Sequence, residues 1–303
     1  MFMDRLEDLN NIPESDIKND IMKSIDVVVG QNNIDQNRIN QWIQNFTGDA
    51  LQDEELEHKL AYWLLYNFTY FNESEVKHMC KSLLNKFIHS ILIKRIYNEL
   101  DKDQIKDVLN EVYFRGIGEP SESGDYILYL FRQVNHIPVS LFNAKNNNKK
   151  IVTFIDDVSL SGQQAYETIK NSTLSNDTEI YLLTFITTEH AVEKLNELNV
   201  NVIYCIVLDD SSKAFSENSY VFYNLKDVKD QCEKMCYYYG KKCYKDHPLG
   251  YDNGQLLIGF YYTVPNETLP IFWSDSNGWN RLFERYGKSN GLWRLIDELG
   301  RYV

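Results

Sequence analysis

The chain lacks the features that would place it in a membrane or outside the cell. It has no run of about 18 apolar residues, the length that a membrane-spanning helix needs. Its first ten residues are acidic and contain no apolar stretch of the signal-peptide kind, so we expect no secretory signal. Its five cysteines have no regular spacing, which is typical of a reducing compartment rather than of a disulfide framework. We therefore expect a soluble, cytoplasmic protein without a membrane partner.

Basic residues are also scarce. Lysine and arginine together number 31 against 44 acidic residues, which gives a formal net charge of −13. This balance argues against a protein that coats nucleic acid through general basicity. Lys149–Lys150 and Lys241–Lys242 are candidates for a local basic patch, although short basic pairs more often belong to a solvated surface.

What the chain does contain is enough apolar residues for one large domain or two ordinary ones, 43% of 303. The pattern of these residues changes near residue 110. Before that point they recur at helical spacing, and we expect residues 1–110 to form an all-helical region. The positions that carry this pattern are Leu56, Leu60, Trp63, Leu64, Phe68, Val76, Cys80, Leu83, Leu84, Phe87 and Ile91.

After residue 110, apolar strands alternate with amphipathic helices. Continuous runs of Val, Ile, Leu and Phe between such helices indicate a parallel sheet buried on both faces. We therefore expect residues 111–303 to form an α/β domain with a mostly parallel, doubly wound sheet and a C-terminal hood rich in aromatic residues. The expected strands are residues 112–115, 137–143, 151–155, 179–187, 200–208 and 255–263, and a last helix is expected at residues 292–299.

An acidic pair follows the third of these strands. Ligands gather at the carboxyl ends of parallel strands, and Asp156 and Asp157 lie at such an end. Adjacent carboxylates repel each other and need cationic or hydroxyl partners. The two hydroxyls of a ribose, together with Mg²⁺, would supply both.

The residues after the acidic pair lead into a helix start and form a candidate phosphate site. Free backbone N–H groups, serine hydroxyls and a glycine are the groups that bind an anion at such a place. A capping box from Ser161 to Gln164 would explain part of the pattern without any ligand. Acidic pairs at strand ends also occur in receiver domains and in haloacid-dehalogenase-like phosphatases. The candidate phosphate-binding residues are Ser159, Leu160, Ser161, Gly162, Gln163 and Gln164.

This string resembles the diphosphoribose-binding signature of type I phosphoribosyltransferases, in which a hydrophobic strand precedes two acidic residues, three variable residues, Ser or Thr, and Gly. The resemblance implies that Asp156 and Asp157 hold the ribose as catalytic residues and that the following loop cradles its 5′-phosphate. It also implies a pyrophosphate loop earlier in the chain. That loop would contain Ser121, Glu122, Ser123 and Gly124.

The segments GEPSESG, FRQVNHIP, FIDDVSLSGQQ and HPLGYDNGQLLIGFYYTVPNETLPIFW together resemble one group, the phosphoribosyltransferase-like family of bacterial conflict systems called PRTase-CE. The resemblance implies a toxic antiphage effector, in some systems encoded beside a retron reverse transcriptase. Such an effector would bind a phosphoribosyl or nucleotide ligand with Mg²⁺ and cleave or transfer at ribose C1′. The alternatives are a non-catalytic ligand sensor and a module that docks on a defence-locus partner, such as a reverse transcriptase with its DNA or RNA.

Two departures from ordinary salvage enzymes leave base salvage in doubt. Gln163 and Gln164 stand where the signature usually has Gly-Thr, and the polar turn at residues 143–150 is short where many relatives have a long catalytic loop. Such loops exclude water and complete the site.

Two further groups of residues have competing interpretations. Asn266 could read the polar edge of a base and Trp273 could stack on its ring, or both could belong to a rigid loop that closes the aromatic core. The spacing C-x3-C-x6-C-x3-H suggests zinc superficially, but its first two cysteines lie in a helical pattern. We expect buried free cysteines and no zinc. The residues of this pattern are Cys232, Cys236, Cys243 and His247.

Overall fold

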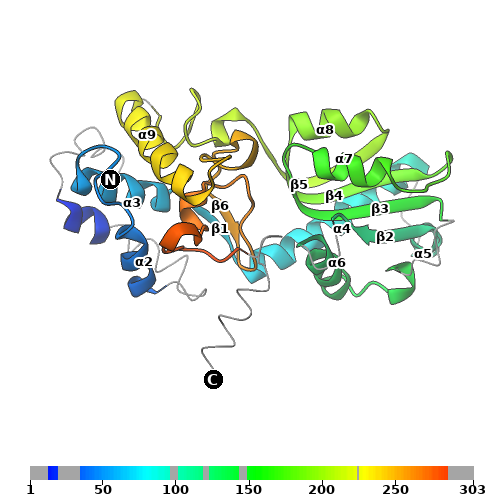
Figure 1. Cartoon of the computed structure of the whole chain (residues 1–303). Coiled ribbons are helices and arrows are strands. Elements are labelled where there is room, and N and C mark those ends of the chain that lie inside the picture. Colours follow the sequence, from blue (N-terminus) through cyan, green and yellow to red (C-terminus); the bar gives the residue numbers. More distant parts are fainter. Residues whose placement is uncertain are drawn as a thin grey trace, which may run out of the picture. The chain divides into compact units, whose positions relative to one another are not determined.

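A computed structural model of the chain divides it into two compact units (Figure 1). The first unit consists of Met1–Asn72 and Ser211–Val303, and the second of Glu73–Asp210. The boundaries between the two units thus follow Asn72 and Asp210, and neither coincides with the change of sequence pattern near residue 110. The structure describes residues 13–19, 35–95, 102–118, 123–142, 149–223 and 225–285.

The second unit is built on a parallel sheet of four strands in the order β2-β3-β4-β5. Every neighbouring pair is parallel, which confirms the α/β class and the parallel sheet. The inner strands β3 and β4 are long apolar runs because both faces of the sheet are covered there, whereas the edge strand β5 is mostly half-buried. Their bounds are Val112–Gly116 (β2), Ile151–Ser159 (β3), Glu179–Thr188 (β4) and Val200–Leu208 (β5).

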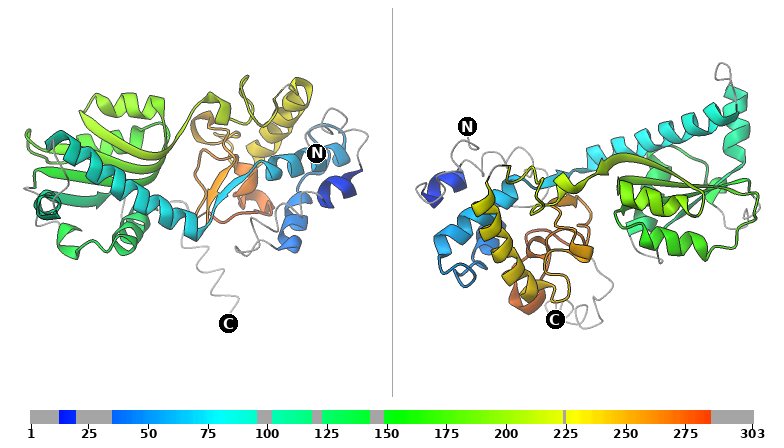
Figure 2. Two further views of the ribbon diagram at one scale, coloured as in Figure 1. Left: turned by 180° about the vertical axis from the view of Figure 1, so that it is seen from behind. Right: turned by 90° about the horizontal axis from the view of Figure 1, so that it is seen from above.

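Helices cover both faces of this sheet (Figures 1 and 2). On one face, side chains of β3 and β4 such as Phe154 and Leu182 pack with those of α7 and α8. On the other face, Phe114 and Tyr181 contact Phe87 of α4. The helices are α4 (Glu73–Arg95), α6 (Ser123–Val134), α7 (Gln163–Lys170) and α8 (Glu189–Asn196), with α5 (Lys102–Asn110) before β2.

The helix α4 lies in the region expected to be a separate helical part, yet it packs on the sheet. Its apolar residues at helical spacing are fully buried, as the periodicity requires. A single helix cannot bury such a stripe alone, and the uncovered face of β4 and β5 provides the partner. The buried residues of this stripe are Val76, Cys80, Leu83, Phe87 and Ile91.

The first unit combines helices with a small parallel sheet around an aromatic core. Its helices are α2 (Gln36–Ile43), α3 (Glu54–Tyr66) and α9 (Lys226–Cys243). Thr69–Phe71 (β1), in the region expected to be wholly helical, pairs in parallel with Ile258–Phe260 (β6). The longer strand expected at residues 255–263 is thus reduced to β6 and does not join the main sheet.

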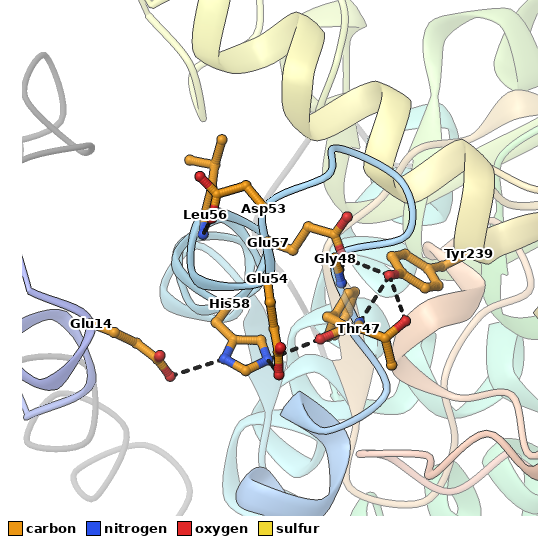
Figure 3. Close-up of polar contacts among 10 residues, drawn as sticks. Glu14, Thr47, Gly48, Asp53, Glu54, Leu56, Glu57, His58 and Tyr239 are labelled. Carbon is orange, nitrogen blue, oxygen red and sulfur yellow. Dashed lines mark hydrogen bonds and ion pairs between the residues drawn. The ribbon is translucent and has the colours of Figure 1, made fainter.

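A buried carboxylate fixes the connection between α2 and α3 (Figure 3). Glu57 accepts hydrogen bonds from the backbone N–H groups of Gly48 at 2.9 Å, Ala50 at 2.8 Å and Leu51 at 2.8 Å. The hydroxyl of Tyr239 on α9 also donates to it at 2.5 Å. Because the carboxylate is fully satisfied inside the protein, it has a structural role.

The strand expected at residues 137–143 is wrong. Val139–Phe142 forms a short 3₁₀ helix instead, and the N–H of Leu141 donates to the carbonyl of Pro138 at 3.1 Å. Proline has a fixed φ and no N–H, so it suits the start of a helical turn and disfavours a central strand. The last expected helix lies outside the described residues. None of the helices that the structure describes is long and apolar enough to cross a membrane.

Candidate functional site

The acidic pair lies inside β3, within its last four residues, rather than directly after the strand. Asp156 and Asp157 are each only 6% exposed. Successive residues of a strand point to opposite faces, which places Asp156 on the face covered by α7 and α8 and Asp157 on the face covered by α6. The two carboxylates therefore lie on opposite faces of the sheet, near the carboxyl end of β3, and do not lie side by side.

The start of α6 contacts the acidic pair. The hydroxyl of Ser123 donates to Oδ1 of Asp157 at 3.2 Å, and the same oxygen accepts from the N–H of Val158 at 2.9 Å. At Gly124, a Cβ would lie 2.0 Å from the carbonyl oxygen of Ile117, so only glycine fits this close approach. The described end of the expected pyrophosphate loop thus contacts Asp157, one member of the acidic pair, while Ser121 and Glu122 lie outside the described residues.

Three threonine hydroxyls of β4 hold the backbone around the acidic pair and the loop. Thr184, Thr187 and Thr188 donate to the carbonyls of Asp157 at 3.1 Å, Ser159 at 2.9 Å and Leu160 at 2.6 Å. Thr188 is also the N-cap of α8. Sequence reasoning missed these residues, although the polar positions of TFITT within an apolar strand were the available signal.

Gly162 is the N-cap of α7 and has a φ of +68°. A Cβ at this position would lie 3.2 Å from two backbone atoms of Ala191 in α8. Ser161 therefore precedes the cap, and its hydroxyl accepts from the N–H of Gln163 at 3.3 Å. The serine hydroxyl and the start of a helix lie together here, as the phosphate site requires.

The side chain of Gln163 runs along α7 and does not extend past its N-terminus. Its Nε2 donates to the carboxylate of Glu167, and its Oε1 accepts from the ammonium group of Lys194 on α8. The ammonium group also lies 5.8 Å from the ring centre of Tyr166. No sequence signal pointed to Lys194, because its position depends on how two helices pack.

The acidic pair fits Mg²⁺ only together with a ligand. Within the described part of the chain, no three His, Cys, Asp or Glu side chains are grouped as a metal centre would need. Mg²⁺ in nucleotide sites is commonly held by one or two carboxylates, several waters and the phosphates of the substrate. Asp156 and Asp157 could supply the carboxylates of such a donor set, and water and the phosphates of a ligand would have to supply the rest.

Asn266 and Trp273 belong to the first unit, whereas the acidic pair belongs to the second. The indole N–H of Trp273 donates to the carbonyl of Thr268 at 2.9 Å, and the guanidinium group of Arg285 lies 5.1 Å from its ring centre. The carbonyl of Asn266 accepts from the N–H of Tyr251 at 2.7 Å. Both side chains are half-buried, so each retains accessible surface.

The cysteines of α9 are free thiols on its core side. Cys232, Cys236 and Cys243 are buried, and burial, followed by the neighbouring Cys232 thiol, raises the pKa of Cys236 well above its ordinary value. Burial likewise raises the pKa of Cys243, so the thiols of Cys236 and Cys243 are neutral at physiological pH. His247 lies with its ring 5.0 Å from that of Tyr244.

The sequence of one known protein family matches most of the chain. The sequence model of the PRTase-CE family matches residues 39–285. The chain belongs to the PRTase-CE family. The match includes the acidic pair, the loop at Gly162 and the strand and turns of the first unit, so it covers residues of both units. No curated protein and no solved structure matches the chain.

Proposed function

We propose that this PRTase-CE protein binds a phosphoribosyl or nucleotide ligand at the carboxyl edge of its parallel sheet and acts on it at ribose C1′. The hydrogen bond between Ser123 and Asp157 carries the proposal. It joins the end of the loop expected to bind pyrophosphate to the carboxylates expected to hold the ribose. A phosphoribosyl pyrophosphate needs both groups within one ligand length.

Each part of the site has a role in this proposal. Asp156 and Asp157 would accept hydrogen bonds from the ribose hydroxyls, and residues 159–164 with the start of α7 would bind the 5′-phosphate. The loop at residues 121–124 would bind the pyrophosphate, or its equivalent, at C1′. Mg²⁺, held through the ligand's phosphates, would neutralise charge on the leaving group.

The bond that breaks joins C1′ to a pyrophosphate or to a base, and its electron pair departs with the leaving group. Positive charge then develops on the ribose, and the two buried carboxylates would stabilise it. Water or a second nucleophile would form the new bond at C1′. As a biological role we propose a toxic effector of a bacterial antiphage system, such as a retron, restrained by a partner from the same locus.

A second function, ligand sensing without turnover, is favoured by the contacts of Gln163. A phosphate at the start of α7 would compete for the ammonium group of Lys194 on α8, which donates to the side chain of Gln163 on α7. Ligand binding would then change the contact between two helices, and this is the kind of signal that a partner could read.

The test replaces the acidic pair by Asp156→Asn with Asp157→Asn. A second adjacent pair, Asp209 and Asp210, is exposed after β5 and offers a matched control with the same loss of charge. Growth after induced expression, calorimetry with phosphoribosyl pyrophosphate and Mg²⁺, and mass spectrometry of products would be measured for both variants.

We expect the Asp156/Asp157 variant to lose toxicity, ligand affinity and product while its circular dichroism is unchanged, and the Asp209/Asp210 variant to keep all three. Full toxicity in a folded Asp156/Asp157 variant would contradict the catalytic proposal. Ligand affinity without product, across nucleotide and nucleic-acid acceptors, would favour the sensor.

A further inference from the structure

The exposed face of the C-terminal half of α9 (yellow in Figure 1) carries lysines and tyrosines. The residues recur at intervals of three and four, which places them on one side of the helix. Tyr237 and Tyr238 are 45% and 39% exposed, so both rings are accessible to a partner. We call this face the Lys–Tyr stripe, which consists of Lys234, Tyr237, Tyr238, Lys241 and Lys242.

The opposite side of α9 is fixed in the core, so the stripe stays in solvent. Met235, Cys236 and Tyr239 are fully buried. At Gly240, a Cβ would lie 1.9 Å from the carbonyl oxygen of Pro248, which shows how closely the helix backbone approaches the next segment. The helix therefore cannot rotate to bury its tyrosines without breaking this packing.

The stripe is positively charged in an acidic protein. Residues 234–245 include four lysines and four tyrosines and no Asp or Glu, whereas the whole chain has a net charge of −13. Lys242 lies 3.5 Å from Asp49, but both side chains are about half exposed, and such ion pairs contribute little. A local cationic surface of this kind attracts an anionic partner despite the overall charge.

Each tyrosine ring has an ammonium group over one of its faces, which leaves the other face for a partner. The Nζ of Lys241 lies 4.6 Å from the ring centre of Tyr237, and that of Lys242 lies 4.6 Å from the ring centre of Tyr238. An aromatic ring offers a surface on which a base stacks, and an adjacent ammonium group offers a partner for the phosphate. The two pairs repeat this combination on one helix face.

We propose that the Lys–Tyr stripe binds single-stranded nucleic acid. Unpaired bases can stack on the rings, whereas the bases of a duplex are already stacked on each other. An acidic peptide would use the lysines but would leave the exposed rings without a matching group. This binding surface is independent of the proposed reaction at ribose C1′.

The first experiment measures the fluorescence anisotropy of labelled oligo-dT and oligo-U of about 20 nucleotides with the full chain. Lys241→Ala with Lys242→Ala should weaken binding about tenfold or more. It should also reduce the slope of log affinity against log salt, between about 50 and 200 mM, by about 1.4. Lys77→Ala with Lys150→Ala removes the same charge from exposed lysines elsewhere and should change the affinity less than about twofold.

The second experiment separates stacking from charge. Tyr237→Leu with Tyr238→Leu should weaken binding to single strands about tenfold or more and leave the salt slope unchanged. A duplex of the same length should bind more weakly than the single strand. Thermal melting of each variant checks that α9 is intact.

Three results would overturn the proposal. The first is no anisotropy change with either oligonucleotide at about 50 mM salt. The second is equal loss of affinity in the stripe variant and in the Lys77/Lys150 control. The third is binding to phosphatidylserine vesicles or to an acidic peptide that the stripe variants abolish, without binding to single strands.

Discussion

Two separate features of the structure require glycine at position 162: its positive φ and its close approach to α8. Its φ of +68° is unfavourable for any residue with a Cβ, and the added atom would also lie 3.2 Å from α8. The sequence predicts a glycine that allows a phosphate to approach the backbone. The structure adds that the same glycine sets the packing of α7 on α8, which a motif confined to one segment could not reveal.

We expect Gly162→Ala to destabilise the protein by about 2 kcal/mol or more, because φ strain and crowding against α8 add. Gly278→Ala is the matched control. Gly278 has a φ of +77° and nothing within 4 Å of the added Cβ, so it should cost only about 1 kcal/mol. Urea unfolding of both variants measures the difference. Equal losses would show that contact with α8 contributes nothing.

At the scale of elements, β4 supports the candidate site through its hydroxyls. Thr187 is fully buried and its only described role is to hold the carbonyl of Ser159 at 2.9 Å and to approach that of Thr188 at 3.5 Å. Thr153 in β3 is equally buried, but its hydroxyl has no hydrogen-bond partner. The sheet thus contains one buried hydroxyl that is hydrogen-bonded, at Thr187, and one that is not, at Thr153.

We expect Thr187→Val to destabilise the protein by about 1 kcal/mol and to weaken binding of ribose 5-phosphate, because the loop loses an anchor. Thr153→Val replaces an unsatisfied hydroxyl by a methyl group and should be neutral or stabilising by up to about 1 kcal/mol, with unchanged ligand affinity. Urea unfolding and calorimetry test both variants. A Thr187→Val protein with unchanged stability and full affinity would show that the hydroxyl of Thr187 does not support the site.

Elements whose signal is local could be predicted from the sequence, and those that depend on distant partners could not. The apolar runs of β3, β4 and β5 and the periodicity of α6 identify them directly. The acidic pair was expected directly after a strand at residues 151–155, whereas β3 continues through it to Ser159. The pairing of β1 with β6 joins segments almost 200 residues apart, and the packing of α4 on the sheet is likewise non-local.

The same distinction explains what was missed at the candidate site. The order of loop, strand, acidic pair and glycine can be read from the sequence. The hydrogen bond from Ser123 to Asp157 cannot, because it joins residues 34 positions apart. Pro138 is a local signal against a central strand, and the prediction of a strand at residues 137–143 overlooked it. Hydroxyl anchors such as Thr184 resemble ordinary strand residues until their partners are known.

At the scale of the whole molecule, both units bury thiols and phenols whose neutral forms the fold favours. Burial, followed by the nearby Cys205, raises the pKa of Cys80 in the second unit from 9.0 to about 12. In the first unit, burial, followed by Glu57, raises the pKa of Tyr239 from 10.0 to about 12. Both shifts have the same sign, so high pH destabilises both units.

The pH range follows from the pKa of Cys80. Below pH 9 the thiol is protonated in the folded and unfolded states, and its full contribution to stability is present. As pH rises from 9 toward about 12, only the unfolded state loses the proton, so the free energy of unfolding should fall by about 1.4 kcal/mol per pH unit for this group. Urea unfolding at intervals through this range should show the decline, and Cys80→Ala should reduce its slope in the second unit. An identical slope in wild type and variant would show that Cys80 is not the titrating group.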